Sequence, residues 1–239
     1  MKILLSLAVC KPDKRTESLY DGIELLYPQE DESEKEFLIR AIKVAKGKYT
    51  VICDRNFAFA DVQPLLNIID KNTADMVCFT NGAAIKTSVL KTVAKDCTDS
   101  FSCRVLGVLA CKNLLKTIYN PFRFEKVSGK FTDENITAFL RSAEAFGKVK
   151  AKLNKEIYSY ASTLLCERFV VFYMYAMIAI KEGDFEADKL IEFDNKLKAE
   201  IVLYLNLEQK FTAAKLSVLR GKGFKISGLK ARKFRKLLK

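Results

Sequence analysis

The fold is decided by residues 45–57, which read Ala-Lys-Gly-Lys-Tyr-Thr-Val-Ile-Cys-Asp-Arg-Asn-Phe. An amphipathic helix before this stretch is expected to stop at Gly47, because glycine is common just past a helix end. The apolar run that follows predicts a short buried strand ending at Asp54. In open α/β sheets, ligands bind outside the carboxyl ends of the strands. Asp54 is therefore a candidate ligand contact at that edge of a sheet.

Apolar strands alternate with amphipathic helices on both sides of this stretch. The expected strands are 2–9, 23–27, 49–53 and 76–80, and the expected helices are 33–46 and 64–70. Such alternation is typical of a mostly parallel sheet flanked by helices, so we predict an α/β fold. The apolar run 101–111 fits either a strand or a buried helix.

The following region is predicted to contain one helix and one strand. The helix begins at Thr132 or Asp133 and ends at Gly147. Apolar residues then alternate with lysines over 149–153, which predicts a half-exposed strand.

The C-terminal part is expected to be helical. The apolar run 169–180 is shorter than the roughly 20 residues of a membrane-spanning helix, so it predicts a buried core helix. We predict an α/β domain at 1–158, a helical region at 159–220 and a basic tail at 221–239.

Charge is distributed unevenly along the 239 residues. The net charge is +12, and residues 209–239 hold eleven of the 41 Lys and Arg but no Asp or Glu. The rest of the chain is nearly neutral, with 30 basic and 29 acidic residues. Tails of this kind bind anionic lipid or nucleic acid. The near-neutral body argues against an extended phosphate-contacting face, so a nucleic-acid partner is not expected.

The basic tail combines cations with a few apolar residues. Phe234, Leu237 and Leu238 fall on one helical face, with Lys and Arg on the other. This pattern predicts adsorption to an anionic membrane surface, and a solvated, frayed terminus is the alternative.

Cysteine and histidine usage restricts the chemistry. The chain has no His, which excludes Ser-His-Asp and Cys-His catalysis and makes a zinc site unexpected. Its seven Cys include no Cys-x-x-Cys pair, which is typical of reduced, buried thiols in a cytoplasmic protein.

Two stretches of the chain resemble the family 2 glycosyltransferases, which have the GT-A fold. In that family a helix leads into an A-x-G-x-Y-hydrophobic strand that ends in an Asp-x-Asp motif. The matching residues here are Ala45, Gly47, Tyr49, Val51 and Asp54-Arg55-Asn56, followed by a helix and a strand that begins like the family's at 74–77.

The second stretch follows an aromatic, proline-containing loop. The family places an acidic pair at the start of a helix after such a loop, and residues 120–124 and 131–134 are similar. Residues 155–160 resemble the family's later P-hydrophobic-Y-x-Y strand. The resemblance places Asp133 at the position of the catalytic base, with Glu134 as the substitute one residue on.

The resemblance implies transfer of a sugar from a nucleotide-sugar donor to a surface polysaccharide or glycolipid acceptor. The enzyme would work on the cytoplasmic face of the membrane as a peripheral protein. Asp54, with Arg55 and Asn56, would contact the ribose or a Mn²⁺ or Mg²⁺ diphosphate unit, with Asp54 as the metal ligand. Asp133 would deprotonate the acceptor as the nucleotide diphosphate leaves.

The chain also departs from the family pattern. Its N-terminal nucleotide-binding part is truncated, and the last Asp of Asp-x-Asp is Asn56, whose neutral carbonyl is a weaker ligand for a divalent cation. Arg55 would replace part of the metal's role by pairing with a diphosphate.

The alternative is a catalytically inactive relative that acts as a binding or scaffold module with a protein partner. Asp54 would then cap a turn and Asp133 a helix, and Arg55 and Asn56 would be exposed loop residues.

Overall fold

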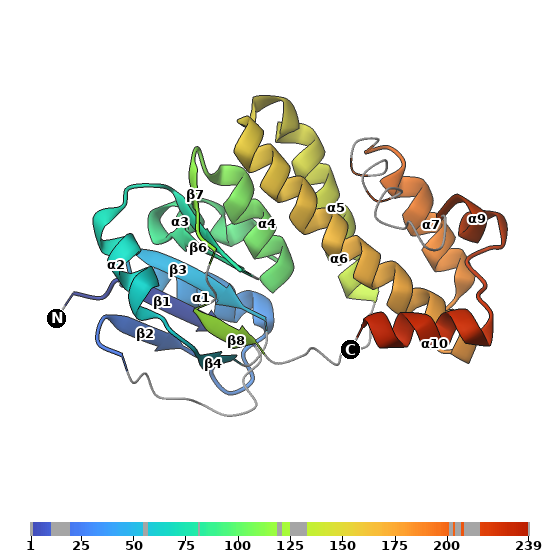
Figure 1. The fold of residues 1–239 in the computed structure, drawn as a ribbon, viewed down its shortest axis with the longest axis horizontal. Helices are drawn as coiled ribbons and strands as arrows, with labels where there is room; N and C mark the ends of the chain where they lie inside the picture. The colour runs from blue at the N-terminus through green and yellow to red at the C-terminus, as the bar shows by residue number, and fades with distance from the viewer. Residues whose placement is uncertain are drawn as a thin grey trace. The chain divides into compact units, whose positions relative to one another are not determined.

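The structure is a computed structural model that describes residues 2–10, 20–54, 57–80, 82–118, 121–124, 133–200, 203, 207 and 216–238. The chain divides into two compact units (Figure 1). We call Met1–Val127 with Lys152–Tyr158 the α/β unit, and Ser128–Ala151 with Ser159–Lys239 the helical unit. Residues 128–151 thus group with the helical unit, although the sequence analysis placed them in the α/β domain.

A mostly parallel sheet forms the centre of the α/β unit. Within the described residues it has six strands, in the order β2-β1-β3-β6-β5-β7. They are β1 Leu5–Val9, β2 Ile23–Leu26, β3 Tyr49–Cys53, β5 Met76–Phe79, β6 Gly82–Lys86 and β7 Leu114–Lys116. Strand β6 is antiparallel to both neighbours, and the remaining pairs are parallel. The predicted α/β class is therefore confirmed.

A second, two-stranded sheet accompanies the first. Strand β4, Phe57–Phe59, pairs antiparallel with β8, Phe122–Phe124. The pairing joins segments that lie more than sixty residues apart in the sequence. Strands β5, β6 and β7 of the main sheet come between them in chain order.

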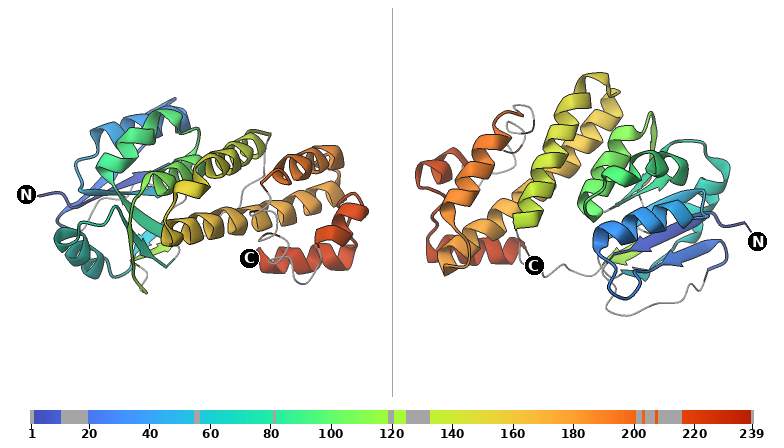
Figure 2. Two further views of the ribbon diagram at one scale, coloured as in Figure 1. Left: turned by 90° about the horizontal axis from the view of Figure 1, so that it is seen from above. Right: turned by 180° about the vertical axis from the view of Figure 1, so that it is seen from behind.

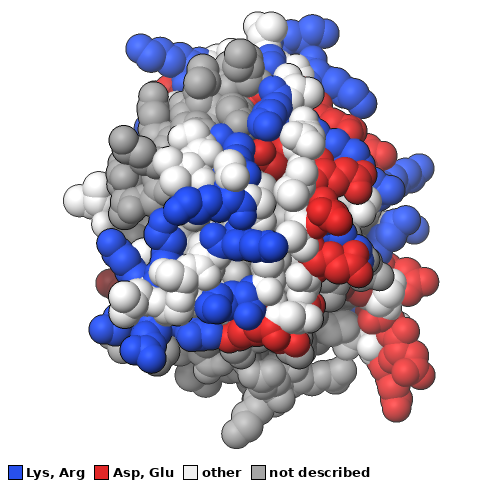
Figure 3. Space-filling view, turned by 90° about the vertical axis from the view of Figure 1, so that its right-hand side faces the viewer, with Lys and Arg blue, Asp and Glu red and all other residues white. Residues whose placement is uncertain are grey.

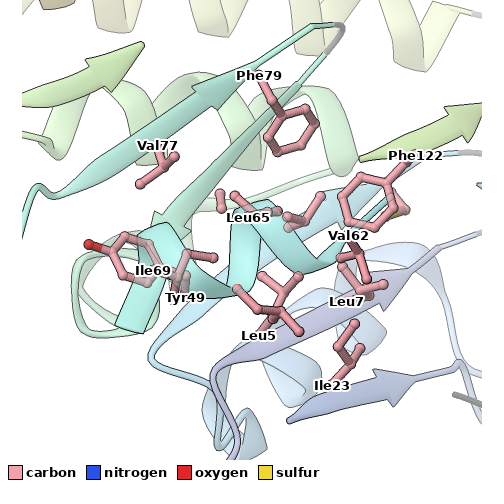
Figure 4. Packing of buried hydrophobic residues seen from close by; sticks show 14 of the residues in the cluster. Leu5, Leu7, Ile23, Tyr49, Val62, Leu65, Ile69, Val77, Phe79 and Phe122 are labelled. Carbon is pink, nitrogen blue, oxygen red and sulfur yellow. The ribbon is translucent and has the colours of Figure 1, made fainter. Parts of the chain in front are cut away.

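Helices cover both faces of the main sheet (Figure 2). They are α1 Glu34–Val44, α2 Gln63–Lys71, α3 Thr87–Val93 and α4 Ser100–Ala110. Helices α1, α3 and α4 contact one another and strands β1 and β3. Helix α2 packs on the opposite face, where its apolar side chains join those of the strands and Phe122 (Figure 4).

Local signals explain where the helices begin. Ser33 and Glu36 form a capping box at the start of α1, and Asp99 and Ser102 form another at the start of α4. The run 101–111 is therefore helical, which settles the choice that the sequence left open.

The helical unit is organised around packed aromatic rings. Its described helices are α5 Asp133–Val149, α6 Lys155–Glu182, α7 Ala187–Leu197, α9 Leu216–Gly221 and α10 Gly228–Leu237. The rings come from α5, α6, α7 and the turn after α9, with neighbouring centroids 4.7–6.0 Å apart, and belong to Phe139, Phe169, Phe172, Tyr173, Phe193 and Phe224. Among the described helices, α6 alone is long and apolar enough to cross a membrane by length and composition. Phe169, Phe172 and Met177 on α6 are nevertheless fully buried, as expected of a core helix.

Two predicted strands are helical instead. Residues 149–153 continue from α5 into the 3-10 turn Lys150–Lys152, and residues 155–160 form the start of α6. Asn154 begins α6, because its side-chain oxygen accepts a hydrogen bond from the backbone N–H of Ile157 (2.9 Å). The alternation of apolar residues and lysines was too short to identify a strand that has no neighbour to pair with.

Gly147 does not end helix α5, contrary to expectation. The helix continues to Val149. A Cβ at position 147 would lie 2.2 Å from Glu200 Oε1, so the missing side chain leaves room for the Glu200 carboxylate. That carboxylate accepts a hydrogen bond from Lys150 at 3.0 Å.

The basic C-terminus is folded rather than frayed. Helix α10 begins at the Ser227 cap and packs through Ala231 and Phe234, which are 2% and 4% exposed. Phe234 therefore faces the protein, which corrects the expectation that it shares a membrane-facing side with Leu237 and Leu238.

Candidate functional site

The candidate site lies at the carboxyl ends of β1 and β3. The chain leaves β1 to form β2 on one side and returns to form β3 on the other, so strand order reverses at this point. Val9 is in register with Cys53, and the backbone N–H of Cys10 donates to the Cys53 carbonyl at 2.9 Å. Such a reversal is where open α/β sheets usually bind ligands. Asp54 follows β3 directly at this switch point.

The Asp54 carboxylate is held by an arginine from helix α4. Arg104 Nη2 donates to Asp54 Oδ2 at 2.7 Å, and the two side chains are 20% and 8% exposed respectively. Because α4 packs on β3, the guanidinium reaches the end of the strand from the face that α1, α3 and α4 cover. The pair combines an anionic group that can accept hydrogen bonds from hydroxyls with a cation that fixes its orientation.

Close packing at the other end of these strands sets their register. Gly47 precedes β3, and a Cβ there would lie 2.5 Å from the Ser6 nitrogen and 2.7 Å from the Leu5 carbonyl carbon. The Gly47 N–H donates to Ser6 Oγ at 2.9 Å, and Ser6 Oγ donates to Glu24 Oε2 at 2.7 Å. Gly47 therefore brings β3 against β1, and the register carries Cys10 and Asp54 to the same edge.

Other ionisable groups surround this edge. Burial raises the pKa of the Cys10 thiol well above its usual value, and the negative charges of Glu34 and Asp54 raise it further while Arg104 opposes them. Burial also raises the pKa of Asp99, which caps α4, despite its hydrogen bonds from Ser102. Glu34 Oε1 accepts from the Ser100 N–H at 2.8 Å.

The N-termini of α1 and α4 thus meet the carboxyl ends of β1 and β3. The carboxylates of Glu34, Asp54 and Asp99 and the guanidinium of Arg104 lie there. Carboxylates suit the hydroxyls of a ribose, whereas they repel a diphosphate that brings no cation of its own.

The described part of the chain contains no ready-made cluster of metal ligands. There, no group of three or more Cys, Asp and Glu side chains is placed to hold one. Mg²⁺ usually keeps several waters and is bound by one or two carboxylates together with substrate phosphates. Asp54, whose Oδ2 bonds Arg104, could therefore serve as one ligand only together with the diphosphate, and dependence on Mn²⁺ or Mg²⁺ stays a prediction.

Of the other predicted site residues, the structure describes only the backbone of Asp133 and Glu134. Arg55 and Asn56 lie outside the described residues. Asp133 is the first residue of α5 and belongs to the helical unit, whereas Asp54 belongs to the α/β unit. The side chains of Asp133 and Glu134 lie outside the description.

Arg104 was missed by the sequence analysis. It lies 50 residues from Asp54, so no local pattern joins the two. A signal was nevertheless present, because Arg104 is the single charged residue within the apolar run 101–111. A charge inside a buried helix predicts a partner of opposite charge.

A second Asp–Arg pair lies in the helical unit. Asp194 on α7 is 2% exposed and accepts hydrogen bonds from Tyr173 Oη at 2.6 Å and Arg220 Nε at 2.7 Å. Lys198 Nζ approaches the same carboxylate at 3.5 Å. Because hydrogen-bond donors from α6 and α9 converge on Asp194 among packed rings, this pair serves the packing of the unit.

No protein-family model, curated protein or solved structure matches this chain.

Proposed function

We propose that the α/β unit binds a nucleotide-sugar donor at the switch point between β1 and β3, and that the chain is a glycosyltransferase. The sugar passes to a surface polysaccharide or glycolipid acceptor. The single observation that supports this proposal is the position of Asp54, directly after β3 where strand order reverses.

Each residue has a chemical role in the proposal. Asp54 accepts hydrogen bonds from the ribose hydroxyls, and Arg104 orients its carboxylate. Arg55, its neighbour in sequence, pairs with the diphosphate. Asp133 takes the proton of the acceptor hydroxyl while the acceptor oxygen displaces the nucleotide diphosphate from the sugar. No step here uses a metal ion, and dependence on Mn²⁺ or Mg²⁺ stays a prediction of the resemblance.

Calorimetric titration with nucleotide diphosphates tests the site. We expect the full chain to bind one of UDP or GDP, and Asp54→Ala to weaken that binding at least tenfold, because the ribose hydroxyls lose their acceptor. Asp70→Ala is the matched control. Asp70 lies on α2 and pairs with Lys2, which precedes β1. This pair lies at the amino ends of the strands, whereas Asp54 lies at the carboxyl ends. An unchanged affinity in Asp54→Ala, or no binding by the wild-type chain, contradicts the proposal.

Turnover tests the reaction separately. We expect Asp133→Asn to abolish hydrolysis or transfer of the donor sugar while nucleotide affinity stays unchanged. Assays with and without manganese then report the metal dependence.

A catalytically inactive scaffold is the second candidate. It is favoured by the Asp54–Arg104 pair itself, because a carboxylate that is 8% exposed and bonded to a guanidinium is also what a structural ion pair looks like. In that case the wild-type chain hydrolyses no donor sugar, and Asp54→Ala lowers stability without affecting any ligand.

A further inference from the structure

The C-terminal basic segment, residues 216–238, is strongly basic. It contains α9 and α10 and carries no acidic residue. Its eight cations are Arg220, Lys222, Lys225, Lys230, Arg232, Lys233, Arg235 and Lys236. Figure 3 shows Lys and Arg side chains over much of the face that it draws, with most of the Asp and Glu side chains along its right-hand side.

Two of these cations pair with acidic residues in the described part of the chain. Arg220 bonds Asp194, and Arg235 bonds Glu182. The other six have no acidic partner among the described residues. A cluster of uncompensated cations attracts anionic surfaces and repels other cations.

Packing fixes which side of α10 faces outward. Phe224 and Phe234 are 1% and 4% exposed, so the segment is anchored in the helical unit. With those positions buried, helical periodicity turns Leu229, Arg232, Lys233 and Lys236 to the solvent as one exposed stripe.

Exposed aliphatic side chains accompany the cations. Among the described residues of the helical unit, the exposed large hydrophobic side chains are Val218, Leu229 and Leu237, at 46%, 78% and 63%. All three lie on α9 or α10. Surfaces that bind single-stranded nucleic acid present aromatic rings for base stacking, and none of these three is aromatic. Cations interspersed with exposed leucines suit the headgroup region of a bilayer.

We propose that the C-terminal basic segment docks the protein on an anionic lipid bilayer, with the stripe on α10 facing the headgroups. Binding is mainly electrostatic, because Phe234 faces the protein rather than the lipid. It therefore weakens with added salt and does not depend on glycosyl transfer.

Vesicle flotation of the full chain tests this proposal. We expect binding to vesicles of 70% phosphatidylcholine and 30% phosphatidylglycerol at 100 mM NaCl, little binding to pure phosphatidylcholine, and release at 500 mM NaCl. The triple variant Arg232→Ala, Lys233→Ala, Lys236→Ala should bind roughly a hundredfold more weakly, at about fivefold for each cation lost near an anionic surface. Leu229→Asn, made alone in the wild-type chain, should weaken binding at 100 mM NaCl.

The matched control removes the same charge elsewhere. Lys43→Ala, Lys91→Ala and Lys95→Ala lie on exposed positions of the α/β unit and should leave vesicle binding nearly unchanged. Circular dichroism of each variant reports whether it folds. Equal losses in both triple variants contradict the proposal, as does equal binding to neutral and anionic vesicles. Tighter binding to random-sequence duplex DNA than to the anionic vesicles would assign the segment to nucleic acid instead.

Discussion

The two units bury their interiors by different means. In the α/β unit, mostly aliphatic side chains from the strands, with Tyr49, Phe79 and Phe122 among them, meet those of α2, and strand register determines which of them face each other. In the helical unit, aromatic rings pack edge to face, and a buried carboxylate links three elements through directed hydrogen bonds. We therefore expect the first core to tolerate volume-conserving changes of single side chains better than changes in backbone spacing. We expect the second to be sensitive to loss of the Asp194 carboxylate.

The two Asp–Arg pairs show the same contrast. Asp54–Arg104 and Asp194–Arg220 both have a bond of 2.7 Å. Asp194 lies among packed rings, whereas Asp54 follows a strand at the switch point of the sheet. The same bond length therefore does not identify a role, and position in the topology separates the two pairs.

Removal of the buried carboxylate in the helical unit should have the largest effect. Asp194→Ala is expected to lower the free energy of unfolding by about 3–5 kcal/mol, because Arg220 and Tyr173 lose their buried acceptor. Urea unfolding measures the loss, and hydrogen exchange localises it. We expect lost amide protection in α6 and α7 and retained protection in β1 and β3. Glu192→Ala, which breaks an exposed pair with Lys196, should leave the free energy of unfolding nearly unchanged.

The proposed difference between the two units is wrong if Asp194→Ala lowers the free energy of unfolding no more than Glu192→Ala does. It is also wrong if amide protection is lost equally in both units.

A change of backbone spacing should have the next largest effect, in the α/β unit. Gly47→Ala places a Cβ against the backbone of Leu5 and Ser6 and should cost about 1–3 kcal/mol. Gly221→Ala is the control, because its added Cβ would meet no atom of another described part of the chain within 4 Å. Hydrogen exchange should show weaker protection in β1 and β3 with α6 unaffected. Helix α1 already ends at Val44, before Gly47, so equal effects of the two substitutions would show that Gly47 does not hold β3 against β1.

The smallest expected effect is the pH dependence of stability that comes from the Asp75 carboxylate, just before β5. Burial acts to raise the pKa of Asp75, but hydrogen bonds from the Lys112 N–H (2.9 Å) and Lys86 Nζ (3.1 Å) lower it below 3.8 overall. A depressed pKa means that the stabilisation is present above about pH 4 and is lost as pH falls through the folded-state value. Asp75→Asn should therefore cost about 1 kcal/mol at neutral pH.

Urea unfolding at several pH values measures this dependence. The wild-type chain should lose more stability than Asp75→Asn between about pH 5 and pH 3. Parallel curves for the two proteins would show that Asp75 contributes no such stabilisation.

Local pattern was sufficient to predict most elements of the α/β unit. The strand at 49–53 and the helix at 33–46 were predicted because their apolar spacing is regular and caps or glycines bound them. Regular spacing was missing at 155–160, where Ile157 and Tyr158 fit either structure. The decisive signal there was the cap at Asn154, which the strand interpretation left out.

The candidate site was predicted only in part. Asp54 was found because it follows a strand, which is a local property. Arg104, Glu34 and Cys10 were not found, because their positions depend on the order of the strands and on which helix covers which face. The sequence alone leaves both of these open.

By itself, the sequence determined the α/β class, the absence of histidine chemistry and the concentration of positive charge at the C-terminus. These properties depend on composition and on neighbours within a few residues. Only the tertiary structure decided that Asp54 meets Arg104, that β1 and β3 end at the same edge, and which side of α10 faces outward. These depend on packing and register between segments far apart in the chain, where the free energy of burial outweighs local preference.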